Sequence, residues 1–71
     1  MYININKKVG LIIRKYREEQ GYTQLDFAEE CQLSRAYYGR IERGEHSITL
    51  DTCEQICKTL GVSLKDLFNN L

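Results

Sequence analysis

The sequence predicts a small all-α domain built of five short helices. Apolar residues recur at the three- and four-residue spacing of amphipathic helices over most of the 71-residue chain. Side chains that cap the starts of helices precede these stretches, and glycines follow several of them. The chain holds no proline and no repeat, and its one alternating stretch, residues 2–5, is too short to predict a strand. The pattern therefore indicates helices separated by brief turns.

The first helix is expected over residues 6–20. Its apolar side chains share one face at helical spacing: Val9, Ile12, Ile13 and Tyr16. Gly21 follows the last turn, where a glycine commonly ends a helix. The second helix begins after Thr23, because the letters TQLD form a capping-box pattern, and it ends near Cys31. Its apolar face comprises Phe27, Ala28 and Cys31.

The third helix begins at Ser34, a residue type that favours the N-cap position, and ends before Gly44. Only a very short segment separates it from the second helix. Because this turn is too tight for an ordinary antiparallel hairpin, the two helices predict a helix-turn-helix motif over about residues 23–43.

The fourth helix is expected over residues 50–60, with Thr49 as its cap and Gly61 at its end. The fifth helix begins after Ser63, where the letters SLKD form a second capping-box pattern. It is strongly amphipathic, and its apolar stripe comprises Leu64, Leu67, Phe68 and Leu71.

The chain is long enough for one domain, residues 1–71, and a domain of this size buries only about 60% of the surface that its unfolded chain exposes. It therefore lacks room for both a core and a deep active-site cleft. The formal charge is zero, but residues 1–22 carry five basic and two acidic side chains, and residues 23–33 carry only three acidic ones. A neutral chain with segregated charges can still present a basic face.

The residue inventory argues against an enzyme, a metal site and a membrane protein. Three cysteines lie in apolar contexts without a CxxC motif, and His46 is the single histidine, whereas a zinc site needs four well-spaced ligands. We expect reduced core thiols at Cys31, Cys53 and Cys57; a redox pair of the last two is the alternative. Nothing forms a nucleophile–base pair or a phosphate-binding glycine loop, so no catalytic residue, cofactor or small-molecule substrate is expected. The lack of a membrane-length apolar run and of a signal peptide predicts a soluble, cytoplasmic chain.

The segment SRAYYGRIERG, residues 34–44, carries the strongest functional signal. On a helix, Tyr37, Tyr38 and Ile41 share the buried side, and the opposite side holds Arg35, Ala36, Gly39, Arg40 and Arg43. Small residues between guanidinium groups let a helix approach its ligand closely, as the major groove of B-DNA requires, and arginine matches guanine O6 and N7. A solvated arginine face is the alternative, but it does not account for Gly39, which costs about 1 kcal/mol relative to alanine.

Two segments, YREEQGYTQLDFAEECQLSRAYYGRIERG and SITLDTCEQICKTLGVSLKDLF, resemble the Cro and lambda-repressor type (XRE-like) helix-turn-helix DNA-binding family. The resemblance covers about residues 9–71 in the family's order. The chain length and the segment SRAYYGRIERG are most similar to the controller proteins of restriction–modification systems. The resemblance implies a five-helix lambda-repressor-like fold in which helix 34–43 is the recognition helix.

The resemblance also implies roles for individual side chains. The base-contacting positions are Arg35, Ala36 and Arg40. The positions that contact or border the DNA backbone are Thr23, Gln24, Ser34, Tyr37, Arg43 and His46. For Tyr37, a core aromatic with its hydroxyl at the rim is an equal alternative. Arg17 and Glu42 match the family's partly buried ion pair between the first and third helices.

Some positions depart from the family pattern. Gln32 stands where the turn usually has glycine, so a non-glycine residue must adopt the left-handed conformation there. Tyr38 replaces the usual isoleucine or valine, which predicts a more polar core near the third helix. Leu11 and Leu25 are expected to be exposed, and together they could mark a surface for a partner protein.

A single short helix contacts only a few base pairs, so sequence-selective binding normally uses two copies spaced about 34 Å apart. We expect a homodimer joined through about residues 60–71 by part of the stripe Leu64, Leu67, Phe68 and Leu71; packing of this stripe on the fourth helix is the alternative. The predicted function is a transcriptional regulator that binds a palindromic operator in double-stranded DNA. The alternative is an antitoxin-like interaction module with secondary DNA binding.

Overall fold

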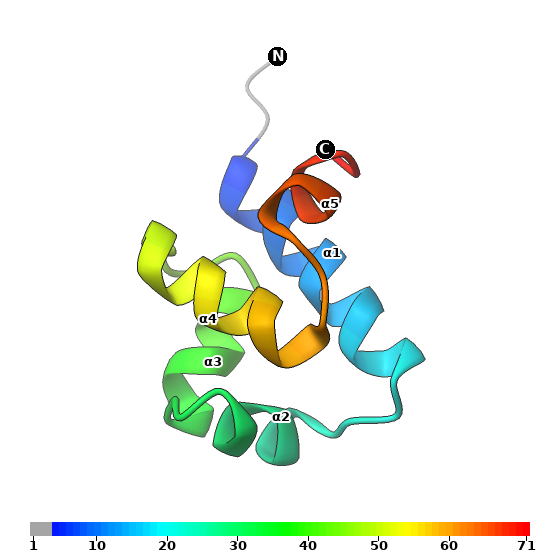
Figure 1. Ribbon diagram of the computed structural model, residues 1–71. Helices are drawn as coiled ribbons and strands as arrows, with labels where there is room; N and C mark the ends of the chain where they lie inside the picture. The colour runs from blue at the N-terminus through cyan, green and yellow to red at the C-terminus, as the bar shows by residue number, and fades with distance from the viewer. Residues whose placement is uncertain (1–3) are drawn as a thin grey trace.

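A computed structural model describes residues 4–71 of the chain, and it confirms the predicted five-helix, all-α fold (Figure 1). The helices are α1 (Ile5–Glu19), α2 (Gln24–Glu30), α3 (Arg35–Glu42), α4 (Leu50–Leu60) and α5 (Leu64–Phe68). The start of the alternating stretch, residues 2 and 3, lies outside the described residues. At its end, Asn4 has an extended backbone as the N-cap of α1, and Ile5 is already the first helical residue, so the stretch does not continue as a strand.

Capping side chains set the helix starts. The side chains of Asn4, Thr23, Ser34, Thr49 and Ser63 each accept a hydrogen bond from a backbone N–H two or three residues further on. The predicted capping box of α5 is complete in both directions. The box predicted for α2 closes in one direction only, through Asp26 N and Thr23 Oγ1 at 3.1 Å, among the hydrogen bonds of residues 4–71. One accepted bond is enough to begin α2 at the predicted residue.

The turn between α2 and α3 takes the strained conformation that the sequence predicts. Gln32 has a φ of 61°, in the left-handed region that costs a side chain other than glycine. Two hydrogen bonds hold the turn to its neighbours. Leu33 N donates to Ala28 O of α2 at 2.9 Å, and Gln55 Nε2 of α4 donates to Cys31 O at 2.7 Å. These bonds fix the direction in which α3 leaves α2.

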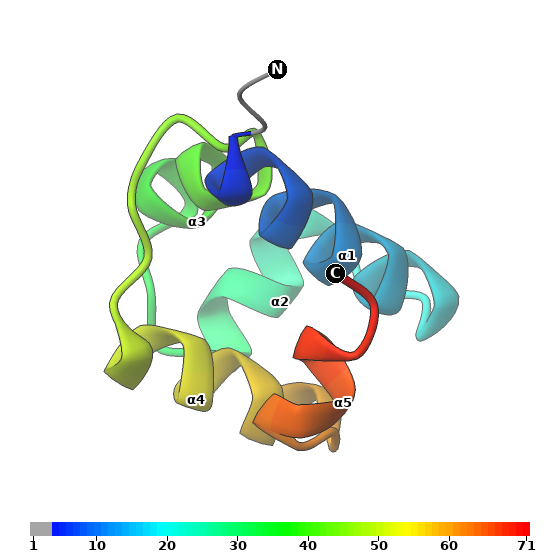
Figure 2. The same ribbon diagram turned by 90° about the horizontal axis from the view of Figure 1, so that it is seen from above.

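The core lies where the five helices meet, and α2 is central in the view from above (Figure 2). It comprises Val9, Ile13, Phe27, Ala28, Cys31, Tyr38, Ile41, Cys53, Ile56, Cys57, Leu60 and Leu67. The three cysteines are buried and free, as predicted. Tyr38 is fully buried with its ring 5.2 Å from that of Phe27, and its hydroxyl makes no hydrogen bond within the described part of the chain. The expected polar group in the core beside α3 is therefore present.

Helices α1 and α3 pack closely because Gly10 lies at their crossing. A Cβ atom added at Gly10 would lie 2.6 Å from Ile41 O and closer still to Glu42 O. Both are backbone atoms, so only glycine allows this approach. No helix formed by residues 4–71 is both long and apolar enough to cross a membrane.

Candidate nucleic-acid interface

The recognition helix predicted from the sequence is α3, and its exposed face carries positive charge only. Tyr38 and Ile41 anchor the helix in the core, whereas Arg35, Ala36 and Arg40 are exposed. The one acidic residue of α3, Glu42, is turned inward. Among the residues of α3 itself, the side that faces solvent therefore has no carboxylate to repel a phosphate backbone.

Arg17 and Glu42 form a buried ion pair, the contact that the family resemblance implies. Arg17 Nε donates to Glu42 Oε2 at 2.7 Å, and Arg17 Nη2 donates to Glu42 Oε1 at 3.0 Å. The two residues are only 7% and 4% exposed. Arg17 Nη1 also donates to Tyr22 O at 2.7 Å, and Gln24 Nε2 donates to Glu42 Oε1 at 3.1 Å. The pair therefore holds α3 against α1 and the start of α2.

The pair remains charged at neutral pH. Burial alone would raise the pKa of Glu42, but hydrogen bonds from Arg17 and Gln24 outweigh burial and hold this pKa below its ordinary value. The hydrogen bond to Glu42 raises the pKa of Arg17 despite desolvation. Because the pKa of Glu42 is depressed, the pair stabilises the fold at pH values above the unfolded-state pKa of this carboxyl, and this stabilisation is lost as the pH falls through its folded-state pKa.

Tyr38 lies beside the pair in the core. Burial, with a smaller effect of the neighbouring Glu42, raises the pKa of Tyr38 well above its usual range, so this phenol stays neutral.

A shallow hollow of about 430 Å³ lies in front of α3. It brings together four predicted DNA-contacting residues with Gly39, and its lining comprises Gln24, Arg35, Ala36, Gly39 and Arg43. Arg40 is exposed but does not line this hollow. By helical periodicity it lies on the neighbouring flank of α3, beside Tyr37. The two predicted base-contacting arginines therefore lie on different flanks of the helix.

Gly39 is not exposed on the outer face of α3, so this part of the prediction is wrong. Gly39 is buried, and a Cβ atom added there would lie 3.0 Å from Arg43 Nη1. The guanidinium of Arg43 therefore lies over the glycine. Glu45 holds it there, because Arg43 Nε donates to Glu45 Oε2 at 2.9 Å and Nη2 donates to Oε1 at 3.3 Å. Glu45 has no role in the sequence-based prediction, although its position two residues after Arg43 is a signal for such a pair.

Two other predicted backbone contacts, Tyr37 in the first turn of α3 and His46 in the segment after it, lie against each other. Tyr37 is half-buried against the core, and its ring meets that of His46 edge-on, with centroids 5.1 Å apart. The exposed His46 Nδ1 lies 2.9 Å from Ser47 O. Tyr37 thus lies at the rim of the core. This position is compatible both with a contact to the DNA backbone and with a core aromatic whose hydroxyl lies at the rim.

The remaining predicted backbone contacts have polar hydrogens to offer. The hydroxyls of Thr23 and Ser34 accept the capping bonds of α2 and α3, but each keeps its own hydrogen for donation. Gln24 uses one amide hydrogen on Glu42 and keeps a second. Gln24 lines the hollow in front of α3, Ser34 begins α3 and Thr23 begins α2, and each side chain keeps a hydrogen that the fold does not use.

The stripe on α5 divides between the core and the surface. Leu67 is fully buried within the chain, so its predicted place at an interface between copies is wrong. Leu64 is half-buried against the core. Phe68 and Leu71 are 41% and 44% exposed, and they are the members that a second copy could cover. Leu11 and Leu25 are exposed, as expected from periodicity.

Two glycine substitutions should have opposite effects on stability. Gly10→Ala is expected to lower the free energy of unfolding by about 1–3 kcal/mol, because its methyl group would meet backbone carbonyls. Gly39→Ala is expected to raise it by up to about 1 kcal/mol, because only the flexible end of Arg43 must move and alanine favours the helix. Thermal unfolding of both variants checks this pair. Equal destabilisation by the two substitutions would show that Gly39 is needed for packing.

Comparisons with known proteins agree with this geometry. A family model described as helix-turn-helix, HTH_3, matches residues 13–67. Control protein C.BamHI of Bacillus amyloliquefaciens is 40% identical over 67 residues, covering 93% of this chain and 83% of that protein. Control protein C.MunI of a Mycoplasma species is 33% identical over 69 residues, covering 96% and 93%. The restriction–modification controller protein C.Esp1396I, solved as a tetramer in complex with its natural 35 base-pair operator, superposes with a TM-score of 0.85 at 37% identity, covering 96% of this chain and 90% of that one.

Proposed function

The chain belongs to the helix-turn-helix family, and we propose that it is a sequence-specific DNA-binding transcriptional regulator of the restriction–modification controller type. The observation that carries the proposal is the exposed face of α3, which presents arginines and a small residue and turns its one carboxylate inward. Such a regulator acts on cytoplasmic DNA and needs no catalytic residue or cofactor.

In the proposed complex, α3 enters the major groove, which is wide enough to admit a helix. Arg35 and Arg40 contact guanine edges through their planar guanidinium groups, and Ala36 lets the helix lie close to the bases between them. The hydroxyls of Thr23 and Ser34 donate to phosphates. These phosphate contacts fix the orientation of α3 but carry no sequence information.

Arg43 has a different role from the other two arginines. In the free chain it lies over Gly39 and pairs with Glu45. An exposed ion pair of this kind contributes little to stability, so a phosphate can displace Glu45 from Arg43. We therefore assign Arg43 to the DNA backbone, together with Gln24, Tyr37 and His46.

We propose that residues 1–71 form one DNA-binding domain that acts as a homodimer. Two copies of α3 must be spaced about 34 Å apart to enter successive major grooves on one side of a duplex. Phe68 and Leu71, with the outer edge of Leu64, supply exposed apolar surface at the C-terminal end of the fold. A two-fold contact there makes the operator a palindrome.

A gel-shift titration with the DNA upstream of the chain's own gene tests the proposed function. We expect binding that is at least about a thousandfold tighter than binding to an unrelated duplex, and that weakens steeply with salt because counterions are released. An unrelated duplex of the same length is the control. Equal affinity for both duplexes at every salt concentration would contradict a sequence-specific regulator.

A further inference from the structure

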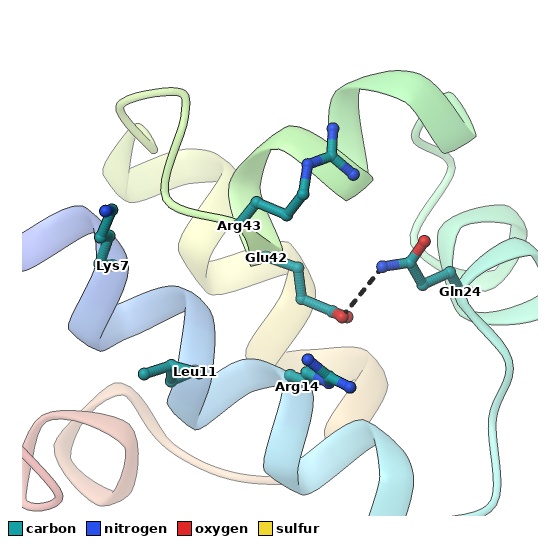
Figure 3. Close-up of a pocket in the computed structure, with 6 residues that line it drawn as sticks. All are labelled: Lys7, Leu11, Arg14, Gln24, Glu42 and Arg43. Carbon is teal, nitrogen blue, oxygen red and sulfur yellow. Dashed lines mark hydrogen bonds between the residues drawn. The ribbon is translucent and has the colours of Figure 1, made fainter.

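A second cleft lies between α1 and α3, beside the hollow in front of the recognition helix (Figure 3). It encloses about 320 Å³, and its lining comprises Lys7, Leu11, Arg14, Gln24, Glu42 and Arg43. We infer that this cleft binds a phosphate of the DNA backbone, so that Lys7 and Arg14 of α1 extend the DNA interface beyond the helix-turn-helix motif. This inference rests on the proposed function, because it names a further part of the same interface.

The charge of the cleft favours an anion. Three of its lining side chains are cationic, and its one carboxylate, Glu42, is already neutralised by Arg17. Lys7 is exposed and makes no ion pair among residues 4–71. Arg14 makes a single 3.3 Å contact with Glu18, and both side chains are more than half exposed. Such a surface pair contributes at most about 1 kcal/mol, so a phosphate can compete for Arg14.

Lys7 is held in place by the backbone that follows α3. A Cβ atom added at Gly44 would lie 2.6 Å from Lys7 Cα, so this part of α1 packs directly on the turn after the recognition helix. Gly44 adopts a φ of 72°, which permits both the turn and the close approach. Figure 3 shows Lys7 and Arg43 extending to the same side of the cleft from its two walls. Both side chains are therefore accessible to a ligand that approaches from that side.

The cleft is continuous with the proposed base-contacting surface, since Gln24 and Arg43 line both hollows. When a helix lies in the major groove, the sugar–phosphate strands run along both sides of it. A strand on the α1 side of α3 would pass over Gln24 and Arg43 and then over the cleft. This continuity favours DNA over an acidic segment of a partner protein, for which the exposed Leu11 would be the anchor.

The test compares Lys7→Ala, Arg14→Ala and the double variant with Lys15→Ala, a matched control. Lys15 lies on the same helix but lines a different hollow with Ile12, Tyr16, Glu19 and Asn70. Affinity is measured at several salt concentrations for the preferred operator and for an unrelated duplex. We expect each single cleft variant to make the slope of log affinity against log salt shallower by about 0.9, and the double variant to make it shallower still, for both duplexes and with an unchanged affinity ratio between them. Lys15→Ala should leave the slope unchanged.

The possible outcomes separate this inference from the proposed function. Sequence-selective binding by the wild type, with cleft variants that match it in affinity and slope, would overturn the phosphate site alone. A changed preference between duplexes without a changed slope would also overturn it, because phosphate contacts are independent of sequence. A wild-type chain that binds no duplex selectively would overturn the proposed function itself. Circular dichroism of each variant verifies that its helices are intact.

Discussion

Replacing Glu42 with alanine is expected to lower the free energy of unfolding by about 3–5 kcal/mol. Among residues 4–71, the substitution leaves the buried guanidinium of Arg17 with Tyr22 O as its one remaining hydrogen-bond acceptor. It also removes the acceptor that Gln24 uses to join α2 to α3. Because small domains are stable by only about 5–15 kcal/mol, this loss is a large fraction of the total free energy of unfolding. Urea unfolding followed by circular dichroism measures the loss.

The double variant Arg17→Met/Glu42→Leu is the control for this prediction. It removes both charges and fills their space with apolar side chains, so it should be less destabilised than Glu42→Ala, because no charge is left buried without a partner. If Glu42→Ala lowers the free energy of unfolding by less than about 1 kcal/mol, the pair contributes no more than an exposed ion pair does. That result would contradict the role of the pair in holding the recognition helix.

Replacing Arg35 or Arg40 with alanine is expected to remove about 1–3 kcal/mol of base discrimination, roughly a tenfold change for each 1.4 kcal/mol. Both side chains are exposed and neither has an ion-pair partner in residues 4–71, so the fold should be unaffected. The measurement is the affinity of each variant for the operator and for operators with single guanine substitutions. Each variant should lose its preference at a different base pair, since the two arginines lie on different flanks of α3.

The control for these variants is Lys15→Ala, which removes one positive charge away from α3. It should leave the preference at every base pair unchanged. If the two arginine variants lower affinity by the same factor for every substituted operator, both side chains contact phosphates. In that case Ala36 and the backbone of α3 would have to supply the specificity.

The helix bounds could be predicted within about a residue because local side chains determine them. Thr23, Ser34, Thr49 and Ser63 cap the helices that follow them, and such caps act over only three residues of sequence. The left-handed turn residue Gln32 was predicted on another ground, the family resemblance, because related chains usually have glycine at this position.

The surface in front of α3 was predicted less well, because it depends on side-chain conformation. A helical wheel places Gly39 on the exposed side, but it cannot show that Arg43 folds back over it toward Glu45. Periodicity likewise put Leu67 and Phe68 on one stripe, and only the packing of α5 showed which of them is buried. Gly10 gave a usable signal, since a glycine inside a helix is costly unless another backbone needs the space.

The central claim is that exposed side chains of α3 select DNA sequence in the major groove. Selection of bound duplexes from a random-sequence library tests it most directly, with the wild type and Arg35→Ala/Arg40→Ala run side by side. The wild type should enrich an inverted repeat with guanines in each half-site and half-site centres about 10–10.5 base pairs apart. The double variant should lose those guanines from its enriched sequences. Enrichment of the same sequence by both proteins, or of no sequence by the wild type, would contradict the claim.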